Sequence, residues 1–139
     1  MKNRFTISDF IPAKASEIYG AWLSSDGHTA MTGSPAQVEG TVGGKFSAWD
    51  GYIYGSTLDL IPTRHIVQAW RTTEFPEEAP DSHLEILLDE IDGRTKVTLT
   101  HRDMPEDQVD SYQQGWDNFY FTPMKKYFSG LDNLANVQK

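Results

Sequence analysis

The chain has 139 residues and contains no cysteine. Disulfide bonds and thiolate metal sites are therefore excluded, and a reducing compartment is permitted. A long apolar run is also missing. The basic residues Lys2 and Arg4 are followed by Ser8 and Asp9, at positions where a signal peptide would be apolar. We expect neither a signal peptide nor a membrane span, and we expect a cytoplasmic protein.

Basic residues are scarce. The chain has 12 lysines and arginines against 20 aspartates and glutamates, which gives a formal net charge of −8. Binding of nucleic acid requires a basic surface, so nucleic acid is not an expected partner. An acidic surface usually serves solubility, and the alternative is a docking patch for a basic partner.

Motifs of catalysis and of cofactor binding are missing as well. There is no hydrolase elbow, kinase loop or zinc-protease motif. The Gly43-Gly44-Lys45 segment does not form a phosphate loop, because Glu39 stands in place of the first glycine and Phe46 in place of the magnesium-binding Ser or Thr. We therefore expect no cofactor, and these motifs give no argument for an enzyme, although a pocket enzyme without a sequence signature stays an alternative.

Histidines offer no metal site by spacing. No two of them are four residues apart, as in a helical zinc motif, and there is no cysteine to complete a site. On the strand alternation, His101 shares a face with Val97 and Leu99, where a buried neutral histidine is the common outcome. The four histidines are His28, His65, His83 and His101.

Most of the sequence reads as strands and turns. Arg4 to Ile11 alternates as a first strand, and two short helices follow, over Ala13–Ser24 and from an N-cap at Asp26 to Met31. From there to about residue 101, apolar-rich runs are separated by turn sequences such as Asp50-Gly51 and Asp92-Gly93. Tight turns between strands predict an antiparallel sheet of about six or seven strands.

The last third of the chain predicts one long amphipathic helix, from Pro105 to Phe128. At ~1.5 Å per residue it would be roughly 35 Å long and would cross a small domain. Pro123 should kink it, Gly115 suggests close approach by another group, and Trp116 should anchor the core. The apolar stripe comprises Val109, Tyr112, Trp116, Phe119, Tyr120, Pro123 and Tyr127.

These elements predict one α+β domain over residues 1–139, in which a curved antiparallel sheet grips the long helix. Residues 130–139 are expected to form a flexible tail. The element order resembles the START-like helix-grip superfamily, which includes the birch pollen allergen and polyketide cyclases. A series of short motifs follows along the chain: Gly43-Gly44-Lys45-Phe46, Asp50-Gly51, Gly55, Leu60-Ile61-Pro62, His65-Ile66-Val67, Trp70-Arg71, Gln113, Gly115-Trp116 and Tyr120-Phe121. In their order and spacing these motifs resemble more closely the family of activators of the ninety-kilodalton heat-shock protein ATPase.

The resemblance covers the chain from Phe5 to about Phe128 and is to the C-terminal domain of that cochaperone. It implies a helix-grip fold and a chaperone-interaction function. The eukaryotic cochaperone also carries an N-terminal domain that supplies much of its chaperone contact, and these 139 residues leave no room for it. Most single-domain members of such a family resemble binders of small ligands or proteins of unassigned function, and family cyclases act by shaping a pocket.

Aromatic residues give the strongest indication of a site. They could fill a solid core between sheet and helix, or they could line an apolar cavity with a few polar handles. A curved sheet does not close fully onto a straight helix, which favours a cavity. The expected lining is Trp49, Tyr54, Trp70, His101, Tyr112, Trp116, Phe119 and Tyr120.

Three functions follow from this reasoning. The first is a non-catalytic domain that binds a small hydrophobic ligand in that cavity. The second is a chaperone-interaction module. The third is a pocket enzyme such as a cyclase, which would need a titratable group with a perturbed pKa inside the cavity. The expected partners are a small hydrophobic molecule or a chaperone, and the protein is a monomer or a homodimer.

Overall fold

A computed structural model describes residues 3–137, with side chains described through Gly130. Two short helices follow the first strand, and a long helical segment ends the chain, as the sequence predicts. The strands are β1 (Arg4–Ile11), β2 (Gln37–Val38), β3 (Lys45–Ala48), β4 (Ile53–Ile61), β5 (His65–Thr72), β6 (Ser82–Ile91) and β7 (Arg94–Arg102). The helices are α1 (Ala15–Trp22), α2 (Ser25–Thr32), α3 (Val109–Trp116) and α4 (Thr122–Val137), with a 3₁₀ turn at Glu106–Gln108 and a π-helical turn at Asp117–Phe121.

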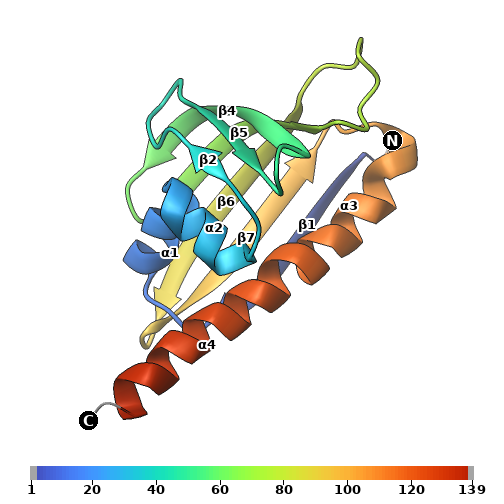
Figure 1. The fold of residues 1–139 in the computed structure, drawn as a ribbon. Coiled ribbons are helices and arrows are strands. Elements are labelled where there is room, and N and C mark those ends of the chain that lie inside the picture. The colour runs from blue at the N-terminus through green and yellow to red at the C-terminus, as the bar shows by residue number, and fades with distance from the viewer. Residues whose placement is uncertain (1–2, 138–139) are drawn as a thin grey trace.

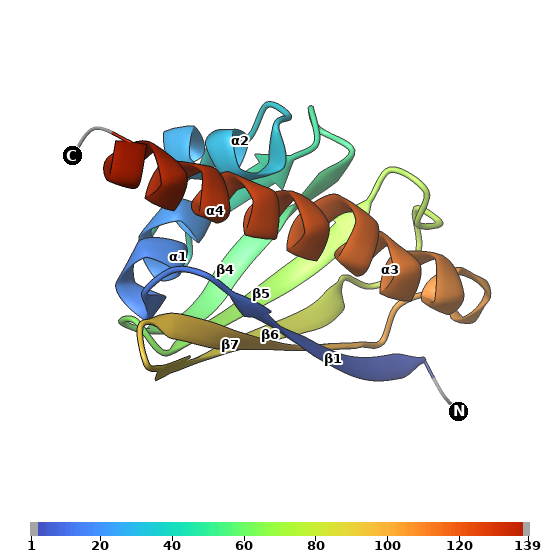
Figure 2. The same ribbon diagram turned by 90° about the horizontal axis from the view of Figure 1, so that it is seen from below.

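The strands form one antiparallel sheet in the order β1-β7-β6-β5-β4-β3-β2. From β2 to β7, each strand pairs with the next strand along the chain. The first strand, β1, pairs with β7 and forms the edge of the sheet opposite β2. The helices all lie on one side of the curved sheet, and the opposite side carries none (Figure 2). The predicted α+β helix-grip architecture is therefore confirmed.

The turns follow the local sequence. Asp92 and Gly93 both have positive φ angles, 54° and 83°, as a two-residue hairpin turn of type I′ requires. The second short helix begins two residues earlier than expected. Its N-cap is Ser24, whose hydroxyl accepts a hydrogen bond from the amide of Gly27 at 3.1 Å. The prediction of Asp26 as the cap is wrong, because Asp26 already lies inside the first turn.

The long helix runs diagonally across the sheet without a break (Figure 1). The kink predicted at Pro123 is not present, because α4 begins at Thr122 and continues through the proline (Figure 1). The irregularity lies just before it, in the π-helical turn, where the amide of Thr122 donates to the carbonyl of Asp117. It also leaves two successive side chains, Tyr120 and Phe121, buried.

The core lies between the sheet and the helices. The helices α3 and α4 contribute buried side chains that are four or eight residues apart. These are Tyr112, Trp116, Met124 and Phe128. The helix continues to Val137, nine residues beyond the predicted end at Phe128, so the backbone is helical over most of the segment expected as a tail. Gln138 and Lys139 lie outside the described residues.

Candidate functional site

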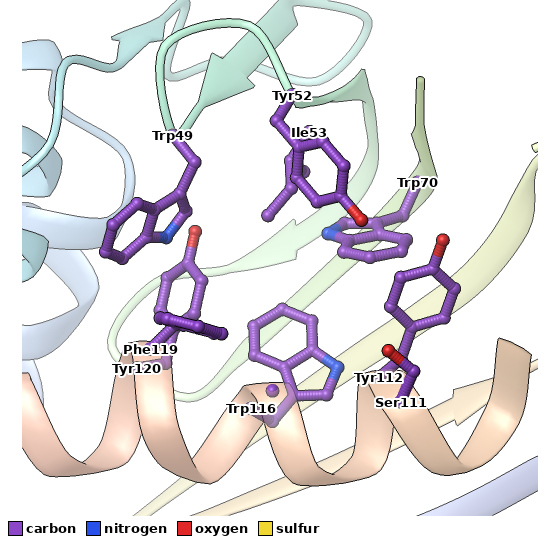
Figure 3. A pocket seen from close by; sticks show the side chains of 10 residues that line it. Trp49, Tyr52, Ile53, Trp70, Ser111, Tyr112, Trp116, Phe119 and Tyr120 are labelled. Atoms are coloured by element: carbon purple, nitrogen blue, oxygen red, sulfur yellow. The ribbon is translucent and has the colours of Figure 1, made fainter. Parts of the chain in front are cut away.

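A partly open pocket of about 410 Å³ lies between the long helix and the strands β4 and β5. Figure 3 shows the aromatic rings that surround it, some rising from the helix and others descending from the sheet. Its lining is almost entirely aromatic or apolar, as in sites for small molecules. The lining residues are Trp49, Tyr52, Ile53, Trp70, Ser111, Tyr112, Gly115, Trp116, Phe119 and Tyr120.

The structure brings six of the eight expected residues together around this pocket. They are Trp49, Trp70, Tyr112, Trp116, Phe119 and Tyr120. Phe119 is 54% exposed at the edge of the pocket, where its ring meets that of Trp49 edge-to-face at 5.4 Å. The other two expected residues, Tyr54 and His101, do not line the pocket.

Tyr54 lies on the other face of the sheet. Ile53 points toward the helix and is buried, so the alternation of β4 sends Tyr54 outward, where it is 41% exposed. Its partner across the sheet is Arg71, which forms an ion pair with Asp81 at 2.9 Å. The prediction that Tyr54 lines the pocket is therefore wrong. The inward-facing residue of β4 is its neighbour Ile53. Arg71 thus lies on the outer face of the sheet, beside a carboxylate from the residue just before β6.

His101 is fully buried behind the pocket wall, not in its lining. Trp116 Nε1 donates a hydrogen bond to His101 Nδ1 at 3.1 Å. Because an indole nitrogen can only donate, Nδ1 is the acceptor, and Nε2 carries the proton. Nε2 then donates to the hydroxyl of Ser82 at 2.8 Å, and Ser82 donates to the carbonyl of Trp70 at 2.6 Å. This chain of hydrogen bonds connects the indole of Trp116 to the backbone carbonyl of Trp70.

Electrostatics keeps this histidine neutral. Burial, with a smaller contribution from nearby His83, lowers the pKa of His101 to about 3. The ring of Trp70 packs edge-on against it, with 4.6 Å between centroids. A buried neutral histidine was the expected outcome, and its role here is to position two tryptophans of the pocket wall.

A second buried histidine supports Tyr120. His28 Nδ1 lies 3.0 Å from the carbonyl of Trp22, so that nitrogen is the donor, and His28 Nε2 lies 2.8 Å from the hydroxyl of Tyr120. The hydroxyl therefore donates to Nε2. Burial lowers the pKa of His28, although its hydrogen bond to the Trp22 carbonyl acts in the opposite direction. Burial also raises the pKa of Tyr120, which stays a neutral phenol.

The hydroxyls of the other two tyrosines that line the pocket also form hydrogen bonds. Tyr52 donates to the carboxylate of Glu74, and Tyr112 donates to the side-chain oxygen of Gln108 at 2.5 Å. The hydroxyl of Thr72 lies 2.7 Å from that of Tyr112. Burial raises the pKa of both tyrosines. The pocket thus presents aromatic faces and neutral phenols, with no ionised group placed for acid–base catalysis.

Trp49 is held in an unusual backbone conformation. Its φ angle is 52°, in the left-handed region that non-glycine residues rarely occupy, and such a residue costs about 1–3 kcal/mol. The following residues Asp50 and Gly51 also have positive φ, and the amide of Asp50 donates to the carbonyl of Pro35 at 2.9 Å. The buried indole nitrogen of Trp49 has no hydrogen-bond partner. It lies near the hydroxyl of Tyr120 and opposes the rise in that pKa, but it does not reach hydrogen-bond geometry.

Gly115 is not in close contact with another backbone. A β-carbon at this position would meet only the ring of Phe119, at 3.7 Å, an ordinary contact distance. The close approach by another group that Gly115 suggested is therefore absent. The missing side chain leaves the space of the pocket open instead.

Sequence reasoning also missed three lining residues, Tyr52, Ile53 and Ser111. Tyr52 lies in the turn before β4, where no periodicity predicts a direction. Ile53 could have been found from the alternation that places Tyr54 outside. Ser111 lies one residue before Tyr112 on the helix, at the edge of the apolar stripe.

The described part of the chain, residues 3–137, contains no group of three His, Asp or Glu side chains that could hold a metal ion. Over the same residues, no helix is both long enough and apolar enough to span a membrane.

A comparison with protein families identifies the family of the chain. Residues 12–129 match the family described as activator of Hsp90 ATPase homolog 1-like protein. The chain belongs to this family. The human activator of 90 kDa heat shock protein ATPase homolog 1 is 32% identical over 127 residues, which are 90% of this chain and 37% of that protein. The Dictyostelium discoideum homologue is 29% identical over 81% of this chain and 30% of its own length. The chain therefore spans about a third of the length of these relatives.

Solved structures share the fold. The Hsp90 activator PFC0360w from Plasmodium falciparum superposes with a TM-score of 0.83 at 23% identity, over 92% of this chain and 97% of its own. The Aha1 dimer from Colwellia psychrerythraea gives 0.71 at 21% identity, over 84% of this chain and 89% of its own. The chain thus has the helix-grip fold of these structures, as the resemblance implied, and the predicted family is confirmed.

Proposed function

We propose that this Aha1-like domain is a non-catalytic binding domain that interacts with an Hsp90-type chaperone. The observation that supports this most strongly is the family match, which covers residues 12–129 and hence almost every element of the fold. The 32% identity with the human activator extends over 90% of the chain. A cytoplasmic location belongs to the same proposal.

The surface of the domain is compatible with a protein partner. One side of the sheet is bare of helices (Figure 2). The strands β4 and β6 carry large apolar side chains with substantial exposure, 41% for Tyr54, 47% for Leu58 and 39% for Leu87. A binding function also fits the pocket, which has no ionised catalytic group.

The chaperone function is tested by measuring ATP hydrolysis by the Hsp90-type chaperone of the source organism with and without the purified domain. The expected result is a saturable increase in rate. Gly115→Leu is the matched control, because it fills the pocket and leaves the outer surface unchanged. An increase that survives this substitution belongs to the surface of the domain and is independent of the pocket.

A second candidate function is the binding of a small apolar molecule, and the aromatic pocket of about 410 Å³ favours it. That volume lies within the range of ligand sites, roughly 300–1,000 Å³. A hydrophobic dye should bind the folded protein with saturable, one-to-one stoichiometry. Binding that appears only as the protein unfolds would reject this candidate and leave the chaperone function as the sole proposal.

A further inference from the structure

The first strand, β1, has one free edge. It pairs with β7 on one side, and within residues 3–137 no strand pairs with its other side. Figure 2 shows β1 at the margin of the sheet, beside the long helix. The opposite margin of the sheet, β2, is only two residues long. An unpaired strand edge presents a row of backbone donors and acceptors to an extended chain that fits beside it.

The register shows which backbone groups this edge presents. The amide of Asp103 donates to the carbonyl of Asn3 at 2.8 Å, so the odd-numbered residues of β1 direct their backbone groups toward β7. The even-numbered residues direct theirs away from β7. Among the described residues, no group binds the backbone N–H or C=O of Thr6 or Ser8. From Arg4 to Ser8 the free edge is about 14 Å long, at ~3.4 Å per residue.

The side chain of Asp9 closes one end of this free edge. Its Oδ1 accepts from the amide of Phe10 at 2.8 Å, and its Oδ2 accepts from Lys125 Nζ of the long helix at 2.8 Å. The amide of Phe10 is the next one that points away from β7, and it is already bound. The available edge therefore ends at Ser8 and has room for an added strand of about five residues.

A solvent-open groove of about 480 Å³ lies along this edge, between β1 and the long helix. The strand contributes Ile7, Ser8 and Asp9 to its lining, and the helix contributes Asp110 and Asp117. These two helical aspartates are seven residues apart, which is two turns, so both face the groove at a spacing of roughly 10 Å. Both are exposed, and neither forms an ion pair with a described residue.

Charge distinguishes between the possible occupants of the groove. A second copy of the chain, paired edge to edge through β1, would place the unpaired aspartates of one copy near those of the other. The net charge of −8 also opposes self-association. A basic segment supplies cations instead. Because the side chains of a strand alternate, those on the inner face of an added strand would meet Asp110 and Asp117, and those on the outer face would lie beside Thr6 and Ser8.

We infer that the free edge of β1 binds an extended, basic segment of a partner protein. The segment adds a strand to the sheet and places alternate Lys or Arg side chains against Asp110 and Asp117. Its outer positions suit β-branched residues, which pack well beside the short side chains of Thr6 and Ser8. The inference goes beyond both functions proposed above, since it assigns a surface that is separate from the aromatic pocket and requires no effect on an ATPase.

The probe is a capped heptapeptide in which lysine alternates with valine. Titration calorimetry measures its affinity, and NMR measures hydrogen exchange of the Thr6 and Ser8 amides. We expect saturable one-to-one binding that slows exchange of both amides, because they donate to the peptide backbone. The same peptide with glutamate in place of lysine should bind at least about tenfold more weakly. No heat and unchanged exchange at peptide concentrations up to about 1 mM would overturn the inference.

Two methylated peptides test whether a strand is added. One carries N-methyl groups on its valine amides and the other on its lysine amides, so the charges stay and one hydrogen-bonding edge is lost in each. In an antiparallel strand the valine amides face β1, and in a parallel strand the lysine amides do. Loss of binding by only one of the two peptides supports strand addition and gives its direction. Equal affinities of the two peptides would overturn it.

Variants of the protein test the edge and its charges. Asp110→Asn/Asp117→Asn should weaken binding of the lysine peptide roughly three- to tenfold, the effect of losing two exposed ion pairs. The matched control Asp50→Asn/Asp59→Asn removes two carboxylates in and before β4, and it should change the affinity by less than about twofold. Equal losses in the two double variants would mean that net charge alone attracts the peptide, and would overturn the inference.

Ser8→Pro removes an edge amide that β7 does not use, so the sheet should stay intact while peptide binding is lost. Circular dichroism checks the fold of this variant, and the methylated peptides repeat the test on the unaltered protein. A dimer of the parent protein in sedimentation that Ser8→Pro abolishes would assign the edge to a second copy and overturn the inference. None of these results bears on ATPase activation or on dye binding in the pocket.

Discussion

Trp116 Nε1 donates a hydrogen bond to His101 Nδ1 across 3.1 Å, and both side chains are buried. One comes from the long helix and the other from β7, so this single contact joins the two layers of the fold. It also fixes the tautomer of the histidine and the orientation of the indole at the back of the pocket.

Removing Trp116 should therefore strongly destabilise the protein. We expect Trp116→Ala to lower the free energy of unfolding by about 3–5 kcal/mol, the usual effect of deleting a buried tryptophan. Trp116→Phe keeps a ring but leaves the acceptor of His101 unpaired, and it should cost about 1–3 kcal/mol. Urea denaturation checks both. A loss under about 1 kcal/mol for the alanine variant would mean that this residue does not anchor the core.

Stability should also decrease in acid because of His101. The pKa of His101 is lowered to about 3 in the folded protein, and the ordinary value is 6.5. Between these values the unfolded chain takes up a proton that the folded protein does not, so stability falls as the pH falls from about 6.5 toward 3. Above this window the histidine is neutral in both states and has no effect. Burial of His28 acts in the same direction.

The measurement compares the parent protein with His101→Gln in urea at a series of pH values. The difference in their free energies of unfolding should shrink by about 3 kcal/mol between pH 7 and pH 4, because only the parent loses this contribution. It should stay constant above pH 7.5, a range that serves as the internal control. A difference that does not vary with pH would mean that His101 titrates alike in both states.

Gly115 should separate stability from ligand binding. Gly115→Ala should stabilise the helix by up to about 1 kcal/mol, because alanine is the better helix former and its β-carbon meets only Phe119 at 3.7 Å. Gly115→Leu should place its side chain in the pocket and prevent dye binding. Thermal melts and dye titrations of both variants test this. Dye binding that persists in the leucine variant would place the dye site elsewhere.

The hydroxyl of Tyr120 should matter more than that of Tyr54. Tyr120→Phe leaves Nε2 of buried His28 without a partner, so we expect a loss of about 1–3 kcal/mol. Tyr54→Phe removes the same atom from a side chain that is 41% exposed, and its effect should stay within about 0.5 kcal/mol. Equal effects in urea denaturation would contradict the hydrogen bond between Tyr120 and His28.

Much of the fold could be predicted because local sequence determines it. Asp92-Gly93 specifies its hairpin turn, and the i, i+4 spacing of Tyr112 and Trp116 specifies the buried face of the helix. The π-helical turn was not predictable, since it depends on how the helix packs before Pro123. It places Tyr120 and Phe121 both inside, which a regular helical period does not predict.

The site was harder to predict than the fold. Tyr54 was assigned to the wrong face because the alternation of a strand gives two equivalent choices, and only the pairing with Arg71 decides between them. His101 was correctly placed inside, but sequence does not tell whether a buried side chain lines a pocket or supports its wall. The strained turn at Trp49 left no sign in the sequence except the following Asp50-Gly51.

The most direct test of the account is a calorimetric titration of the domain into the purified Hsp90-type chaperone of its source organism. The account predicts saturable binding at a fixed stoichiometry, retained in Gly115→Leu and diminished in Trp116→Ala in proportion to the folded fraction. Absence of binding by the folded parent protein at concentrations on the order of 100 μM, where even weak complexes form, would contradict it.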